Sequence, residues 1–167
     1  MSGLLNKLRD SMHGAAFGIV DGVITVLGLT LGVSALSPDR TVILVAGVSV
    51  GIADGLANSA GFFVSEEVAT EHGISNHTKK AIYASSISCF AATLVAVLFP
   101  MIPYLFAKIA IARVVSIMVG LSLLFVFGVI HARFSHESPI KEGLKLVAIG
   151  AIAGAICFAI GKAISMI

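Results

Sequence analysis

The sequence predicts an all-α, polytopic membrane protein with five transmembrane helices, and three observations lead to this fold class. Of the 167 residues, 57% are apolar and 12% are charged, whereas soluble domains are about 45–50% apolar and about 25% charged. The mean hydropathy is +1.04. The apolar residues also gather in five blocks, each long enough to cross about 30 Å of hydrocarbon as a helix.

Short polar connections separate the expected spans, which cover residues 14–36, 41–65, 81–105, 110–130 and 143–164. The connection Ser37-Pro38-Asp39-Arg40 is expected to form a tight turn, because proline presets its φ angle and aspartate accepts bonds from the backbone that follows it. The first two helices should therefore be antiparallel neighbours. We expect residues 1–167 to form a single transmembrane domain.

Two further features shape the expected outline. Pro100 and Pro103 should break the third span near its outer end, because proline lacks an amide donor and clashes with the preceding turn. Residues 66–80 form the longest polar connection. This connection joins the second span to the third.

Basic residues in the connections predict the orientation, since they are retained preferentially in the cytoplasm. One side carries seven of them and the other carries four: Lys7, Arg9, Lys79, Lys80, Arg133, Lys141 and Lys145 against Arg40, Lys108, Arg113 and Lys162. We therefore expect the N-terminus inside and the C-terminus outside.

Glycines recur at every fourth position in the first two spans, as in Gly14, Gly18 and Gly22, and in Gly47, Gly51 and Gly55. Such spacing lets helix backbones approach closely in lipid. It predicts that the first two helices are the tightest packing pair. We also expect these glycine faces to contribute to a homodimer interface.

Two carboxylates lie inside spans, at Asp21 and Asp54. An ionisable group at bilayer depth costs at least about 2.5–3.5 kcal/mol, so such residues usually have a function. The segments around them are similar: Gly18–Thr25 and Gly51–Asn58 share four identities in eight positions. The match does not extend into the flanking residues.

Asp21 and Asn58 each lie seven residues from the expected inner end of their span, which is a depth of roughly 10 Å. On antiparallel neighbours they can face each other, and Asp54 shares the face of Asn58 by its i, i+4 spacing. Carboxylate and amide oxygens suit a hard or borderline divalent cation. Three acidic residues at the inner end of the second span are further metal candidates, although such a cluster is often simply solvated: Glu66, Glu67 and Glu71.

Other functions fit the residues less well. Protonated aspartates that only hold helices together would make the chain a non-transporting membrane scaffold or partner subunit. An aspartyl intramembrane protease would need Gly-x-Gly-Asp, whereas two residues separate Gly18 from Asp21 and Gly51 from Asp54. We therefore predict no enzyme activity, no catalytic residues and no cofactor. The net charge of +2 is small and scattered, which argues against nucleic-acid binding.

Three short motifs resemble the vacuolar iron transporter family: Asp21-Gly-Val-Ile-Thr25, Ala60-Gly-Phe-Phe-Val-Ser-Glu66 and Pro100-Met-Ile-Pro-Tyr104. The resemblance implies a dimeric, proton-coupled exporter of Fe²⁺ or Mn²⁺ from the cytosol into a vacuole or out of the cell. It also implies a first-helix aspartate and a second-helix methionine near the ion path. Asp21 matches that aspartate.

The sequence departs from this family in three places. Asn58 stands at the methionine position, and Asp54 stands where the family has a small residue. The Glu-rich cytoplasmic metal-binding domain of many members is replaced by about 15 residues. We therefore expect a small member of the family that carries Fe²⁺ or Mn²⁺ as its substrate, by proton antiport, across a cell membrane or a vacuole-type membrane.

Overall fold

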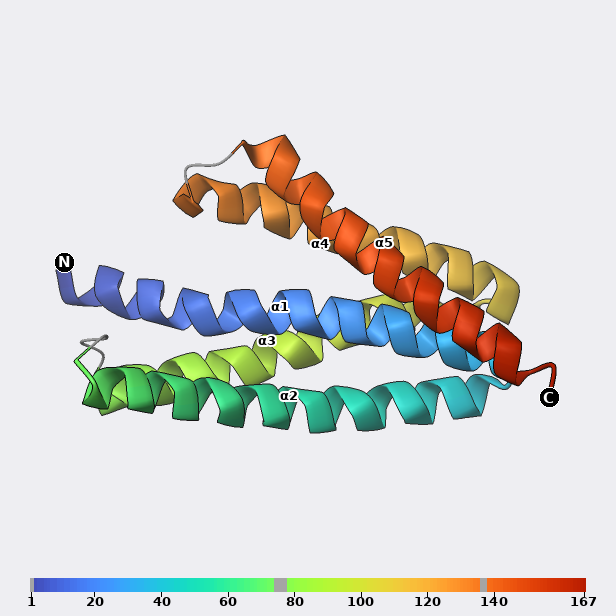
Figure 1. The fold of residues 1–167 in the computed structure, drawn as a ribbon, viewed down its shortest axis with the longest axis horizontal. Coiled ribbons are helices and arrows are strands. Elements are labelled where there is room, and N and C mark those ends of the chain that lie inside the picture. Colours follow the sequence, from blue (N-terminus) through green and yellow to red (C-terminus); the bar gives the residue numbers. More distant parts are fainter. Residues whose placement is uncertain (1, 74–77, 136–137) are drawn as a thin grey trace.

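Within the described residues the expected spans correspond to five long helices, and the all-α prediction is confirmed. The computed structural model describes residues 2–73, 78–135 and 138–167. The helices are α1 (Ser2–Leu36), α2 (Arg40–Glu71), α3 (Lys79–Phe106), α4 (Ile109–Ser135) and α5 (Pro139–Ile164). Each contains a stretch that is long and apolar enough to cross a membrane, and the two termini lie at opposite ends of the bundle (Figure 1).

The turn between α1 and α2 forms as the sequence predicts. Asp39 is the N-cap of α2, and its Oδ1 accepts hydrogen bonds from the backbone amides of Thr41 at 2.7 Å and Val42 at 3.4 Å. These bonds satisfy amides that lack partners inside the first turn of a helix. The turn thereby sets α2 antiparallel to α1.

The C-terminal end of α2 is longer than expected. The helix continues six residues past the predicted end at residue 65 and stops at Glu71, before Gly73 adopts a positive φ of 70°. Glutamate and alanine favour helix, while glycine readily takes a left-handed conformation beyond a helix end. Glu66, Glu67 and Glu71 therefore lie on a helix instead of in a loop. Residues 74–77 of the expected connection lie outside the described residues.

The expected break at Pro100 and Pro103 is wrong, because α3 continues through both prolines to Phe106. Stopping a helix inside the membrane would leave more backbone groups without partners than the prolines themselves do. The carbonyl oxygen of Pro103 accepts the amide of Ala107 at 2.9 Å, which closes the end of the helix.

The glycine faces of α1 and α2 both pack on α3, which corrects the prediction that α1 and α2 are the tightest pair. A Cβ atom on Gly18 would lie 2.3 Å from the carbonyl oxygen of Cys89, and one on Gly51 would lie 2.7 Å from Cγ1 of Val97. The spacing of glycines shows that one face of a helix consists of small residues, but it does not show which helix packs on that face. Here α3 lies against both faces.

Two further glycines of α1, Gly28 and Gly32, pack on Cys157 of α5. A Cβ atom on Gly161 of α5 would lie 2.1 Å from the carbonyl oxygen of Gly32. The helix α1 thus contacts all four others and lies at the centre of the bundle (Figure 1). Because α3 covers Gly18 and Gly51 within one chain, the predicted use of these two glycines in a dimer interface is also wrong.

Replacing Gly18 by leucine should destabilise the fold by about 1–3 kcal/mol, because the added side chain must displace α3 backbone. Gly61→Leu is the matched control, since a Cβ atom there meets nothing within 4 Å. Thermal unfolding of both variants in detergent micelles measures the effect. Equal melting temperatures for the two variants would show that α1 does not pack on α3 at Gly18.

Candidate functional site

Asp21 of α1 and Asn58 of α2 are in direct contact. The Nδ2 group of Asn58 donates a hydrogen bond of 2.5 Å to Oδ2 of Asp21. The sequence prediction that these two side chains face each other at one level is therefore confirmed. The amide oxygen of Asn58 accepts no hydrogen bond within the described residues, and such an oxygen can bind a cation.

Asp54 completes this group from one turn away on α2. Its carboxyl group interacts with Asp21, Thr25 and Asn58. One of its oxygens, Oδ2, is buried and has no hydrogen-bond partner among the described residues. A buried polar atom of this kind is costly unless water, a proton or an ion satisfies it. We call Asp21, Thr25, Asp54 and Asn58 the central polar group.

The similar segments of α1 and α2 explain how this group forms. In each segment two glycines four residues apart pack on α3, and Thr93 of α3 lies against both helices. Its carbonyl oxygen would be 2.8 Å from a Cβ on Gly22, and its Cβ would be 3.6 Å from one on Gly55. Each aspartate immediately precedes the second glycine. The two carboxyl groups therefore emerge beside the contact with α3 and converge between α1 and α2.

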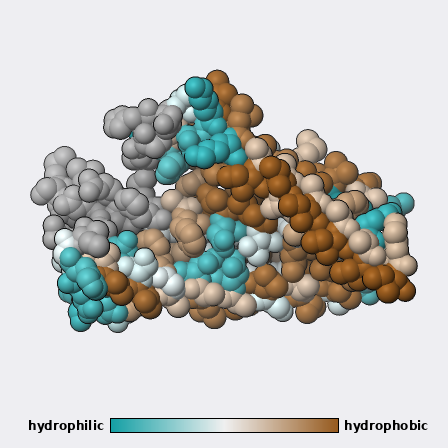
Figure 2. Space-filling view, viewed as in Figure 1, coloured by the Kyte–Doolittle hydropathy of each residue, from teal (hydrophilic) through white to brown (hydrophobic). Residues whose placement is uncertain are grey.

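The central polar group lies about midway along α1 and α2. Figure 2 shows hydrophilic surface in this middle region, with apolar surface on both sides. Asp21, Asp54 and Asn58 are all partly exposed in the single chain. An ionisable group at this depth is expensive in lipid, so this position favours a role in passing a charged substrate.

The donor set consists of oxygens. Within the described ranges, no group of three or more His, Cys, Asp and Glu side chains is close enough to hold a metal ion. The central polar group instead offers two carboxylates, one amide and one hydroxyl. These are hard ligands that suit divalent cations which keep part of their water shell.

The three glutamates lie apart from this group. Glu66 is eight residues beyond Asn58 on α2, which corresponds to about 12 Å along the helix axis. Glu66 and Glu67 are partly buried, whereas Glu71 is exposed. The structure therefore separates the six predicted metal residues into a central group and an acidic helix end.

The sequence predicts no role for Arg113 beyond its contribution to the charge that sets the orientation. In the structure, Nε of Arg113 donates to Oγ of Ser34 at 3.0 Å, and Nη2 donates to the carbonyl oxygen of Ser34 at 2.7 Å. Ser34 lies in the last turn of α1, where carbonyls lack partners within the helix. The signal in the sequence was an arginine only a few residues inside an apolar span.

Comparison with known proteins agrees with the resemblance seen in the sequence. The chain matches the VIT family over residues 12–72 and 66–162. It is 34% identical to an uncharacterized protein of Methanocaldococcus jannaschii over 166 residues, which cover 87% of this chain and 86% of the relative.

Two plant proteins are also similar. Vacuolar iron transporter 1 of Eucalyptus grandis is 34% identical over 95 residues, or 56% of this chain and 38% of the relative. Vacuolar iron transporter homolog 2 of Arabidopsis thaliana is 25% identical over 172 residues, or 96% of this chain and 88% of the relative. With five candidate membrane spans and a family match along most of its length, the chain is a multi-pass membrane protein of the VIT family, whose members are transporters of metal ions and not enzymes.

Proposed function

We propose that the chain carries a divalent cation, Fe²⁺ or Mn²⁺, across the membrane and that the central polar group binds this ion. The observation that carries the proposal is the contact between Asp21 and Asn58, with Asp54 beside them. Two carboxyl groups this close repel each other when both are ionised, and a divalent cation removes that repulsion. Family membership and the plant relatives named as iron transporters support the same substrate class.

We propose that transport is coupled to protons. A proton shared between the two neighbouring carboxyl groups and a bound divalent cation would each offset the repulsion between two negative charges. A bound cation needs deprotonated oxygens, so its binding expels that proton. Release of the cation on the other side allows the proton to return, which gives exchange of metal for protons.

We also propose that the N-terminus and the acidic end of α2 face the cytosol, so that the metal leaves the cytosol. The side that we expect to face the cytosol carries seven basic residues, whereas the other side carries four. On the opposite side, Arg40 donates to the carbonyl oxygens of Leu105 at 3.2 Å and Ala107 at 3.0 Å. Arg40 thus caps the end of α3, as Arg113 caps the end of α1. Two of the four basic residues counted on this opposite side therefore have a structural role.

We propose a homodimer as the working form. The central polar group is partly exposed on the single chain, and a second copy would shield it from lipid. The same domain, residues 1–167, would then act as one of two equal transporter units.

Asp21→Asn should abolish metal-driven proton movement, because it keeps the size of the side chain and removes the exchangeable charge. Asp39→Asn is the matched control, since Asp39 caps α2 in the turn and asparagine is an equally good cap. Proteoliposomes with a pH-sensitive dye inside report the proton flux that follows addition of Fe²⁺ or Mn²⁺. Transport by Asp21→Asn at the parent rate and pH dependence would make the aspartate structural and favour the scaffold role.

Asn58→Met should shift the preference from Mn²⁺ towards Fe²⁺, because a thioether is a softer ligand than an amide oxygen. Asp54→Ala should weaken Mn²⁺ transport more than Fe²⁺ transport, since it removes a hard ligand. Competition between Fe²⁺ and Mn²⁺ in the same vesicles measures the ratio of their transport rates directly. If both variants keep the parent ratio, these side chains do not set the choice of metal.

Replacing Glu66, Glu67 and Glu71 together by glutamine should raise the half-saturating metal concentration more than it lowers maximal flux. These carboxylates lie about 12 Å or more from the central group and would only concentrate cations near its entrance. The rise in the half-saturating metal concentration should occur in inside-out vesicles, where the cytosolic face of the protein is exposed to added metal. A complete loss of flux would show that the glutamates are required, and a shift confined to right-side-out vesicles would reverse the orientation.

A further inference from the structure

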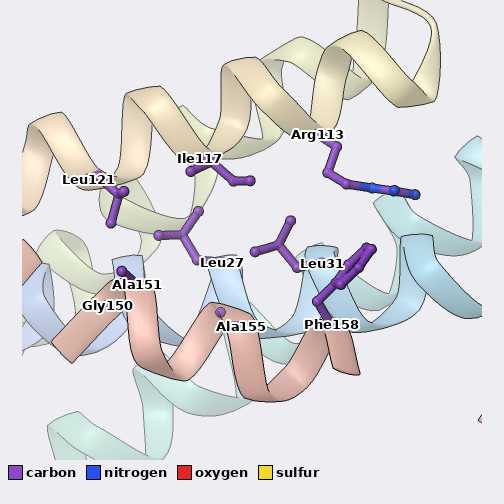
Figure 3. A pocket seen from close by; sticks show the side chains of 10 residues that line it. Leu27, Leu31, Arg113, Ile117, Leu121, Gly150, Ala151, Ala155 and Phe158 are labelled. Carbon is purple, nitrogen blue, oxygen red and sulfur yellow. The ribbon is translucent and has the colours of Figure 1, made fainter. Parts of the chain in front are cut away.

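A groove lies between α1, α4 and α5, away from the central polar group. Its volume is about 290 Å³, near the lower end of the range of about 300–1,000 Å³ for small-molecule sites. Arg113 is the one charged residue of its lining, and the others are apolar, among them Leu27, Leu31, Ile117, Leu121 and Phe158 (Figure 3). The groove therefore combines one cation with a hydrocarbon-like lining.

Arg113 has no negative partner in the described part of the chain. Its guanidinium group bonds to Ser34 through Nε and Nη2 and lies 5.2 Å from the ring centroid of Phe158. The ion pair described in this structure joins Lys145 to Glu142 and does not involve Arg113. The charge of Arg113 is thus held in place by neutral groups, at a cost that an anion would offset.

The groove has a polar end and an apolar end. Arg113 lies four residues from the start of α4 at Ile109, about 6 Å from that end of the helix. From Arg113 the lining continues along α4 to Leu121, about 12 Å farther towards the middle of the bundle. In Figure 3, Arg113 and Phe158 mark one end of the groove, and Leu121 and Gly150 mark the other.

Small residues of α5 keep this groove open. Ala151 and Ala155 line it and are exposed in the chain. A Cβ on Gly154 would come within 2.9 Å of Cδ1 of Leu31, and one on Gly150 within 2.4 Å of Cδ1 of Leu124. Larger side chains would fill this space or force the helices apart. The width of the groove thus depends on residues without bulky side chains.

We propose that this groove binds an anionic phospholipid, with the phosphate on Arg113 and one acyl chain along the apolar lining. Charge complementarity selects this occupant, because guanidinium groups bind phosphate strongly and Nη1 has no hydrogen bond within the described residues. The depth of Arg113 fits a headgroup near the membrane surface, and the lining fits a chain that points inward. The site is independent of the transport function proposed above.

The absence of tryptophan makes the site easy to test, because one introduced tryptophan is a unique fluorophore. Phe158→Trp places it beside Arg113 and keeps an aromatic face for the guanidinium group. Ile152→Trp is the matched control on α5, since Ile152 is 60% exposed and does not line the groove. Each variant is reconstituted in mixtures of phosphatidylglycerol and phosphatidylcholine in which one of the two lipids carries dibrominated chains that quench tryptophan.

At the Phe158→Trp reporter, phosphatidylglycerol should bind about fivefold more strongly than phosphatidylcholine, as expected for one basic residue near an anionic headgroup. At Ile152→Trp the two lipids should quench equally. Equal quenching at Phe158→Trp would overturn the proposal. No quenching there by either lipid would also overturn it, because protein would then cover the groove.

Second substitutions in the reporter separate charge recognition from packing. Arg113→Gln should remove the preference for the anionic lipid, and Arg113→Lys should keep it, because lysine retains the charge but loses the planar pair of bonds to Ser34. Arg40→Gln, at the other arginine that caps a helix end, should leave the preference unchanged. A preference that survives Arg113→Gln, or that disappears in Arg40→Gln, would show that Arg113 is not the anchor.

Discussion

The close contact of α1 and α2 with α3 is the interaction on which the remaining architecture depends. Glycines on both helices let their backbones approach α3 far more closely than any other side chain would allow. In lipid, where helices gain little from burying apolar surface, such packing is a main source of association. The same contact sets the rotation of α1 and α2 about their axes. That rotation directs Asp21, Asp54 and Asn58 towards one another.

Polar groups in the bundle are mostly satisfied within their own helices, which shows why the central group is unusual. Thr30 donates to the carbonyl oxygen of Val26 at 2.7 Å, and Thr93 donates to that of Cys89 at 2.9 Å. Such bonds to the preceding turn are the usual solution for hydroxyls in apolar surroundings. Carboxyl groups have no such solution, because they need donors that the helix backbone does not offer. The aspartates must therefore find partners on another helix or bind an ion.

Arg40 and Arg113, which lie near the starts of α2 and α4, follow the same constraint. Each donates to carbonyl oxygens at the end of a neighbouring helix, where the backbone has acceptors without partners and a partial negative charge. Arg40 is exposed, whereas Arg113 is partly buried beside an apolar groove. This difference in surroundings gives one arginine a structural role and gives the other, in our proposal, a lipid as well.

The sequence alone determined the fold class, the number of spans, the turn at Asp39 and the contact of Asp21 with Asn58. These follow from hydropathy, from local turn chemistry and from counting residues along two antiparallel helices, all of which depend on short-range physics. Only the tertiary structure decided that α3 fills the glycine faces, that α3 continues through Pro100 and Pro103, and that Arg113 borders a groove. Which helix covers a given face depends on the packing of all five helices together. A single sequence shows that one face of a helix consists of small or polar residues. It does not show which helix lies against that face.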